Sequence, residues 1–217
     1  MFGLSLPTII VRLIILFLAI PIHEWAHAWS AYRLGDDTAS LQGRVTLNPI
    51  AHLDPIGSLL LLFSGFGWGK PVPVNPYQLR TNPRAGMAIT SAAGPFSNFV
   101  LAMLLAIPFR MGWIDLAPTL MTMYAGSFSI GVLLLLAIEI NLGLMLFNLI
   151  PIYPLDGEKV LVGVLPRRWG DSLLRMRPFG SMLLLGLMFV LPRLGVNLIG
   201  MLIAPAHGLL WGLLLLL

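Results

Sequence analysis

His23-Glu24-Trp25-Ala26-His27 lies near the end of an apolar run that begins at about Leu4. Residues four apart on a helix share one face, so His23 and His27 can hold one ion between them, with Glu24 beside it. Two imidazoles that hold Zn²⁺, and a carboxylate that takes the proton of a bound water, are what metal-assisted hydrolysis requires. A pair of hydrogen-bonded core histidines is the alternative, but titratable groups inside an apolar span are costly unless they pair or bind an ion.

The composition is that of a membrane protein. The 217 residues are 58% hydrophobic and 10% charged, whereas soluble domains are about 45–50% apolar and about 25% charged. Five segments approach the ~20 residues needed to cross a hydrocarbon core: residues 4–31, 86–109, 127–150, 176–192 and 195–217. We therefore expect an all-α polytopic membrane protein. The first segment does not look like a cleaved signal peptide, because Arg12 interrupts it and no small-residue cleavage site follows.

The basic residues give an orientation signal rather than a nucleic-acid-binding face. Five of the thirteen follow the first segment and five follow the third: Arg33, Arg44, Lys70, Arg80 and Arg84, then Lys159, Arg167, Arg168, Arg175 and Arg177. By the positive-inside rule both loops are cytoplasmic, with the N-terminus outside and the C-terminus inside. His23 lies about two-thirds along the first span, so we expect the site nearer the cytoplasmic side. The absence of cysteine leaves only histidine and carboxylate as zinc ligands.

The first cytoplasmic loop has a mixed character. Residues 56–66 are apolar but too short to cross, and the prolines at 71, 73 and 76 permit only an edge strand. We expect a small membrane-associated β element, whose exposed edge is suited to pairing with an extended peptide. An ordinary membrane-dipping loop is the alternative. His52 and Asp54 lie in this loop without a shared helical face, so we expect a structural or gating role for them rather than metal binding.

The end of the third span is the second informative stretch, NLIPIYPLDG at residues 148–157. Its two prolines end the helix, so Asp156 is presented from irregular backbone, which at membrane depth persists only inside protein or along a wet cavity. Its carboxylate, on the same side as His23 and His27, is the natural third zinc ligand. A role for Asp156 as the N-cap of a following helix is compatible with this.

Further polar side chains lie inside the predicted spans, among them Asn98 in the second and Glu139 and Asn141 in the third. Asn98 is one turn beyond Gly94 in a stretch of small residues that allows close helix packing. Its amide either hydrogen-bonds a substrate carbonyl or bridges two helices. Glu139 lies at mid-depth in the third span, and we expect it to be neutral or to bridge helices rather than to bind the metal.

The three motifs together resemble the site-2 protease family of intramembrane zinc metalloproteases. The match consists of HEWAH at 23–27, G-x-x-x-N from Gly94 to Asn98, and N-x-x-P-x-x-P-L-D-G from Asn148 to Gly157, in the family's order and spacing. The likeness covers roughly residues 5–165. The wording GFGWGKPVPVNP at 65–76 is similar to short prokaryotic members, so we expect no PDZ or CBS domain.

The resemblance implies a zinc endopeptidase that cuts transmembrane segments of substrate proteins within the bilayer. It implies one Zn²⁺ per chain with His23, His27 and Asp156 as ligands, and Glu24 as general base and proton donor. Asparagines that match Asn98 and Asn148 are associated in the family with substrate or oxyanion binding. The loop that matches residues 40–75 is a membrane-associated β element that engages the substrate.

We thus expect a single membrane-embedded peptidase domain over residues 1–217, in a prokaryotic plasma membrane, with a catalytic core at about 5–165 and C-terminal helices at about 176–217. A zinc or proton transporter with the same buried ligands is the alternative. It would need a polar path on both sides of the metal, whereas the polar residues here cluster on the cytoplasmic side. A catalytically silent scaffold would lack Glu24 or a ligand. The sequence does not name the substrate or the oligomeric state.

Overall fold

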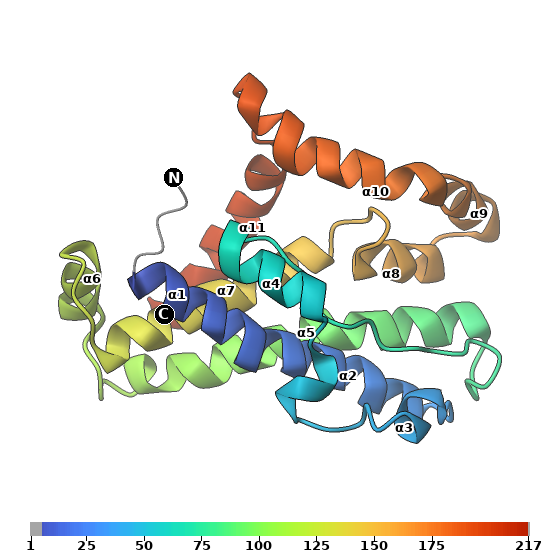
Figure 1. Cartoon of the computed structure of the whole chain (residues 1–217), viewed down its shortest axis with the longest axis horizontal. Helices are drawn as coiled ribbons and strands as arrows, with labels where there is room; N and C mark the ends of the chain where they lie inside the picture. The colour runs from blue at the N-terminus through green and yellow to red at the C-terminus, as the bar shows by residue number, and fades with distance from the viewer. Residues whose placement is uncertain (1–5, 217) are drawn as a thin grey trace.

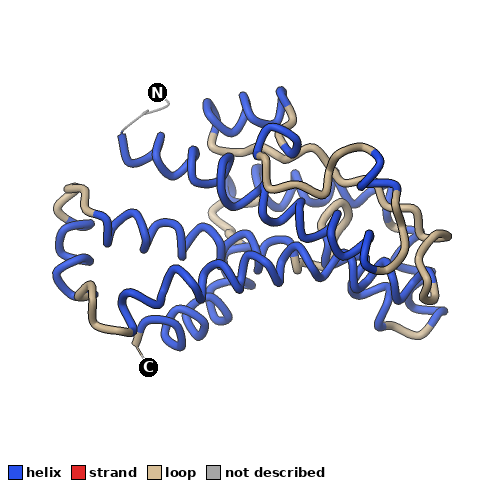
Figure 2. Tube along the Cα trace, turned by 90° about the horizontal axis from the view of Figure 1, so that it is seen from below, coloured by secondary structure: helices blue, strands red, loops and turns tan. Residues whose placement is uncertain are grey.

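The computed structural model describes residues 6–216, and this part of the chain is helical and contains no strand (Figure 1, Figure 2). Within it, five helical stretches are long and apolar enough to cross a membrane: Ile9–Arg33, Pro83–Arg110, Ile130–Asn148, Arg177–Leu194 and Leu198–Leu215. The five spans expected from the sequence are confirmed, with their ends shifted by a few residues.

The first span is one helix with a wide turn in its middle. It consists of α1 (Leu6–Ile14), the π-helical η1 (Ile15–Ala19) and α2 (Ile20–Arg33). Pro21 has no N–H, and the Ile20 N–H just before it donates to the Ile15 carbonyl, five residues back. Such a turn shifts the register of the helix that follows. It thereby sets the face on which His23 and His27 emerge.

The helix α5 (Pro83–Arg110) forms the centre of the fold. It packs against α2, against α7 (Ile130–Asn148) and against α8 (Asp156–Val164), and Figure 1 shows it running alongside α2 and α7. The core between α5, α7 and α11 (Leu198–Leu215) consists of Ala102, Ala106, Phe109, Leu135, Ile138, Leu142 and Leu214. The two alanines allow the larger side chains of α7 to approach the α5 backbone closely.

The loop between the first two spans lacks the expected β element. It holds α3 (Thr38–Leu41), η2 (Pro49–His52) and α4 (Pro55–Ser64). Extended pairing in the described part of the loop is limited to one antiparallel bridge between Leu53 and Gly69. The prolines at 71, 73 and 76 follow directly, and without N–H groups they cannot extend a ladder. The apolar α4 is too short to cross the membrane, as predicted.

The second half of the chain contains shorter helices between the second and third spans, before the fourth span and within it. They are α6 (Leu116–Tyr124), α9 (Arg167–Arg175), α10 (Arg177–Leu185), η3 (Gly186–Val190) and η4 (Pro192–Leu194). Arg177 at the start of α10 donates from Nε and Nη2 to the buried carboxylate of Glu158 on α8, at 2.7 and 2.9 Å. This two-pronged ion pair fixes the start of the fourth span to α8.

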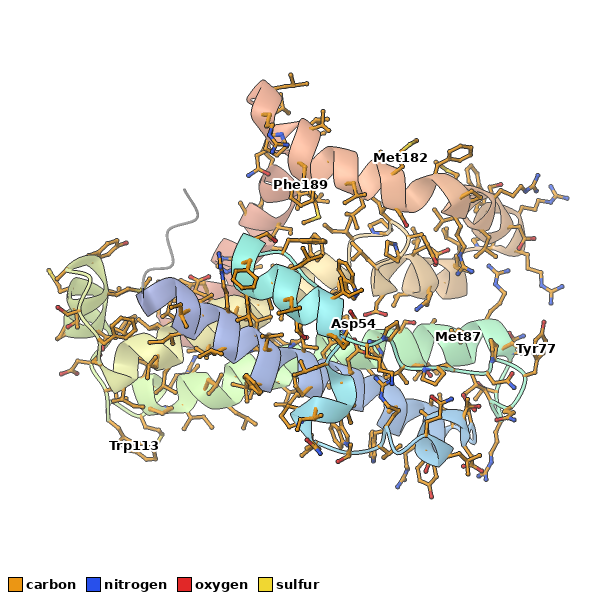
Figure 3. The ribbon with its side chains drawn as sticks, in the orientation of Figure 1. Asp54, Tyr77, Met87, Trp113, Met182 and Phe189 are labelled. Carbon is orange, nitrogen blue, oxygen red and sulfur yellow. The ribbon has the colours of Figure 1, made fainter. Side chains whose placement is uncertain are left out.

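Exposed aromatic side chains lie at both ends of the bundle. Tyr77, before the second span, is 89% exposed, and Trp113, just after it, is 70% exposed. Figure 3 shows the two residues at opposite ends of the long axis. Tyrosine and tryptophan are enriched at the two membrane–water interfaces. Their placement agrees with a bundle whose long axis crosses the bilayer.

Candidate metal centre

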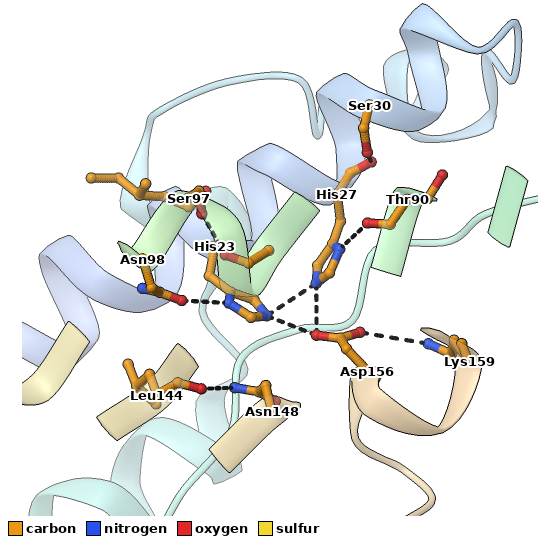
Figure 4. Close-up of polar contacts among 12 residues, drawn as sticks. His23, His27, Ser30, Thr90, Ser97, Asn98, Leu144, Asn148, Asp156 and Lys159 are labelled. Atoms are coloured by element: carbon orange, nitrogen blue, oxygen red, sulfur yellow. Dashed lines mark hydrogen bonds and ion pairs between the residues drawn. The ribbon is translucent and has the colours of Figure 1, made fainter. Parts of the chain in front are cut away.

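Three buried side chains converge where α2 meets the start of α8. His23 and His27 project from α2, and Asp156 is the first residue of α8. The Nε2 atoms of the histidines are 3.0 Å apart, and Asp156 Oδ2 lies 3.1 Å from that of His23 and 3.2 Å from that of His27 (Figure 4). Atoms ~2.0–2.1 Å from a tetrahedral zinc ion are ~3.3 Å from one another. The spacing of the three atoms therefore suits such an ion.

The hydrogen bonds of the two Nδ1 atoms decide whether each Nε2 atom carries a proton or a lone pair. His27 Nδ1 lies 2.7 Å from the Thr90 carbonyl, which can only accept, so Nδ1 carries the proton. His23 Nδ1 lies 2.6 Å from Asn98 Oδ1 and donates to it in the same way. Both Nε2 atoms thus face each other and the Asp156 carboxylate with lone pairs. Three acceptors held together without a donor among them repel one another unless a cation lies between them.

Gly94 provides the close approach that this arrangement needs. Thr90, Gly94 and Asn98 are spaced four apart on α5, so they share the face that is turned to His23 and His27. A Cβ at Gly94 would collide with His27 Nε2 and would lie 2.6 Å from His23 Nε2. Only glycine leaves this side of the site open.

The backbone before α8 presents Asp156. Gly157 lies so close to the Leu149 and Ile150 carbonyls that a Cβ there would overlap them, which explains the glycine of the L-D-G motif. A carboxylate held in this place is suited to be a metal ligand.

The comparison with known proteins agrees with this chemistry. The chain is 38% identical to the "Putative zinc metalloprotease YwhC" of Bacillus subtilis over 190 residues, which cover 86% of this chain and 82% of that protein. The chain belongs to the site-2 protease family of zinc metalloproteases. The protease is also similar to two proteins named "Putative zinc metalloprotease Rip2". The one from Mycolicibacterium smegmatis is 33% identical over 143 residues, 64% of this chain and 51% of the relative.

The Rip2 protein from Mycobacterium tuberculosis is 32% identical over 179 residues, which cover 80% of the protease and 64% of the relative. The protease thus matches only about half to two thirds of the Rip2 chains, but most of YwhC. Neither a family model nor a solved structure matches it.

A cavity of about 360 Å³ opens onto the three converging side chains. Glu24 and Asn148 line it, and so do Thr90 and Lys159. Lys159 Nζ lies 4.0 Å from Asp156 Oδ1. The opposite wall is the irregular segment 71–74 of the first loop, the segment expected to be β-structured. The three converging side chains, Glu24 and the irregular segment 71–74 therefore line the same cavity.

The two asparagines that the sequence singled out lie in different surroundings. Asn148 faces the cavity and donates one N–H to the Leu144 carbonyl at 3.0 Å, which leaves its second N–H to other partners. Asn98 is fully buried and does not line the cavity. Its oxygen accepts from His23, and its nitrogen donates to the backbone carbonyl of Ala19 at 3.3 Å and to Asn141 Oδ1 at 2.8 Å. The bridge between helices, one of the two roles considered for Asn98, is the one its contacts show.

Three other polar residues that the sequence singled out, His52, Asp54 and Glu139, do not belong to the cluster. His52 donates from Nε2 to the Thr46 carbonyl at 2.7 Å, and Asp54 caps α4 by accepting from the Gly57 N–H at 2.7 Å. Glu139 on α7 pairs with His207 on α11 at 2.7 Å, so it bridges two helices. The sequence assigns no partner to Thr90 or Asn141, because nothing in it says which groups on neighbouring helices face His27 and Asn98.

Proposed function

We propose that this zinc metalloprotease is an intramembrane endopeptidase that cleaves transmembrane segments of other membrane proteins. The observation that carries the proposal is the cavity itself, which brings Glu24 and Asn148 together with the three converging acceptors inside a bundle of membrane-spanning helices. One Zn²⁺ held by His23, His27 and Asp156 is part of the proposal. So is a prokaryotic plasma membrane with the site nearer its cytoplasmic side.

Zinc bound there supplies Lewis-acid activation of a water molecule and of the peptide carbonyl. Glu24 lines the same cavity, so its carboxylate accepts the proton of the attacking water and returns it to the leaving amine. The second N–H of Asn148 donates to the oxygen that becomes negative as the carbonyl is attacked. In this step one water molecule adds across one peptide bond and gives a carboxylate and an amine.

The segment 71–74 is the surface along which we place the substrate. The Arg44 guanidinium fixes the start of this segment by donating to the Lys70 and Pro71 carbonyls at 2.5 and 3.2 Å. A transmembrane helix satisfies all its amides internally, so its peptide bonds are inaccessible until it unwinds. An extended stretch of substrate beside residues 71–74 presents its carbonyl to the cavity.

The decisive experiment is a cleavage assay in detergent with a single-span reporter and purified, zinc-loaded protein. Glu24→Gln removes the base but keeps the shape, so we expect cleavage to fall by about 10²–10⁴-fold while zinc content is unchanged. Glu139→Gln is the matched control, because Glu139 lies in a span but outside the cavity. It should cleave at nearly the wild-type rate. Cleavage by Glu24→Gln at the wild-type rate would overturn the mechanism.

A further inference from the structure

A row of buried amides runs from the core of the bundle to the candidate metal centre. Asn141 Nδ2 on α7 donates to the Ala137 carbonyl at 2.8 Å, and Asn141 Oδ1 accepts from Asn98 Nδ2 at 2.8 Å. Asn98 Oδ1 then accepts from His23 Nδ1 at 2.6 Å (Figure 4). Asn98 and Asn141 are both 0% exposed, so neither has water as an alternative partner.

Two backbone carbonyls fix the direction of this row. A carbonyl oxygen can only accept, so the amide nitrogen of Asn141 must face Ala137, and its oxygen must face Asn98. The amide nitrogen of Asn98 must likewise face the Ala19 carbonyl and Asn141 Oδ1. The Asn98 oxygen is then the atom left for His23 Nδ1. The proton of the His23 ring is held on Nδ1, and the lone pair of Nε2 points at His27 and Asp156.

We infer that Asn141 is a positioning residue for the metal centre, acting through Asn98 to keep His23 in the tautomer that binds metal. The inference rests on the proposed function, since it concerns the same centre. Without the Asn141 oxygen, the amide of Asn98 keeps only its longer bond to the Ala19 carbonyl, at 3.3 Å, and turns over more readily to offer its N–H groups to His23 Nδ1. The ring proton then moves to Nε2, the atom that faces the metal position, and coordination is lost.

The row also explains why the two histidines need different orienting partners. His27 Nδ1 donates to the Thr90 backbone carbonyl, which cannot turn over. His23 Nδ1 donates to a side-chain amide, whose two ends differ little in shape but oppose each other in hydrogen bonding. An amide in this place needs other groups to choose its orientation. Asn141 accepts the shorter of the two hydrogen bonds that do so, and it does not line the cavity.

The test measures the affinity of the detergent-purified, metal-free full chain for Co²⁺ by its visible absorption, and for Zn²⁺ by competition with a chelator. Removing a partner that orients a metal-binding histidine typically costs 10–100-fold in metal affinity. We expect that loss for Asn141→Leu, which has a similar volume and no hydrogen-bonding group. Asn141→Asp keeps an oxygen in the place of Oδ1 and, in the protonated form that full burial favours, an O–H for the Ala137 carbonyl, so it should bind within about threefold of the wild type.

Ile138→Ala separates positioning from simple loss of stability. Ile138 is fully buried on α7, one turn from Asn141, and its truncation leaves a cavity in the same α5–α7 core. This variant should unfold at a lower temperature yet bind Co²⁺ with wild-type affinity and spectrum. Wild-type affinity in Asn141→Leu, or an equal loss in Ile138→Ala, would overturn the positioning role.

The same data distinguish this inference from the proposed function. A wild-type protein that binds Co²⁺ tetrahedrally but cleaves no reporter contradicts the proposed protease activity on transmembrane segments. It does not contradict the positioning role of Asn141. A wild-type protein that binds no metal overturns both. Loss of affinity in Asn141→Leu that Asn141→Asp restores supports the positioning role whatever the substrate.

Discussion

Gly94 is the residue with the least freedom to change. Its Cα faces the two Nε2 atoms that form one side of the candidate metal centre, and a methyl group there would occupy space beside both. The G-x-x-x-N motif on α5 therefore has two physical parts. Gly94 gives clearance, and Asn98, one turn further on, orients His23.

Gly94→Ala should abolish metal binding because the added methyl group collides with both imidazoles. We expect the zinc content of the purified variant to fall at least tenfold below that of the wild type, measured by elemental analysis. Gly143→Ala is the matched control, since a Cβ at Gly143 on α7 meets no atom within 4 Å. It should retain its zinc and gain about 0.5–1 kcal/mol of helix stability. Equal zinc in the two variants would contradict this account of Gly94.

Among individual residues, the sequence predicts the candidate metal ligands better than it predicts the residues that position them. His23, His27 and Asp156 are found from motif spacing, because the spacing encodes which side chains share a face or follow a helix end. Asn141 belongs to no such motif. Its position opposite Asn98 depends on how α5 and α7 pack, and many registers of two apolar helices are compatible with the same pattern.

Among the elements, the loop between the first two spans depends on a buried cation and a buried imidazole. Arg44 holds the carbonyls of residues 70 and 71, and His52 supports the turn at Thr46 while its own carbonyl accepts from the Lys70 N–H at 2.8 Å. Burial lowers the pKa of His52 below its ordinary 6.5, the charge of Arg44 lowers it further, and the bond to Thr46 only partly offsets this. His52 is therefore neutral in the folded loop at pH 7.

This shift predicts that the loop loosens in acid. The unfolded loop takes up a proton at His52 near pH 6.5, whereas the folded loop resists protonation until a lower pH. The loop thus keeps its full stability above about pH 6.5 and loses up to about 1.4 kcal/mol for each pH unit below it, down to the lowered pKa.

Hydrogen exchange of residues 44–53 and of the Lys70 amide, compared at pH 7.5 and pH 5.5 after correction for intrinsic rates, measures this loss. His52→Gln keeps a donor for Thr46 but cannot titrate, so its corrected protection should not vary with pH. Protection that is equal at both pH values in the wild type would refute the prediction.

The elements themselves show where sequence reasoning fails. The length of the apolar segments predicted the five spans. Lipid offers the backbone no hydrogen-bonding partner, so an apolar segment of that length crosses it as a helix. The prediction of a β element was wrong for a physical reason. Pro71, Pro73 and Pro76 have no N–H group, so this segment lacks the donors that pairing with a second strand needs. The helix α6 between the second and third spans was also missed. Its nine residues carry no charge and only one helix-breaking residue, Pro118, close to its start.

On the scale of the whole molecule, the candidate metal centre joins the first span to α8, which also carries the ion pair to α10. A ligand that binds only the folded state stabilises it, by about 2.7 kcal/mol at a concentration one hundred times its dissociation constant. For a chain of this size we expect chelation to lower the unfolding temperature by about 5–10 °C. Thermal unfolding in detergent, with and without zinc, measures this shift.

Asp156→Ala removes one of the three proposed ligands and should make unfolding insensitive to zinc and chelator. Glu158→Gln lies two residues away and weakens the ion pair to Arg177 instead. It should lower the unfolding temperature but keep the shift on chelation. A zinc-dependent shift that survives in Asp156→Ala would show that the metal binds elsewhere.

The long separation in sequence between the paired histidines and Asp156 has a consequence for biosynthesis. His23 and His27 enter the bilayer with the first span, but the carboxylate follows only after two more spans have been made. A chain still attached to the ribosome at residue 150 has the proposed base and two ligands, yet lacks the third. Under the proposed function, newly made protein therefore cannot cleave neighbouring nascent helices until the Leu-Asp-Gly turn has been made.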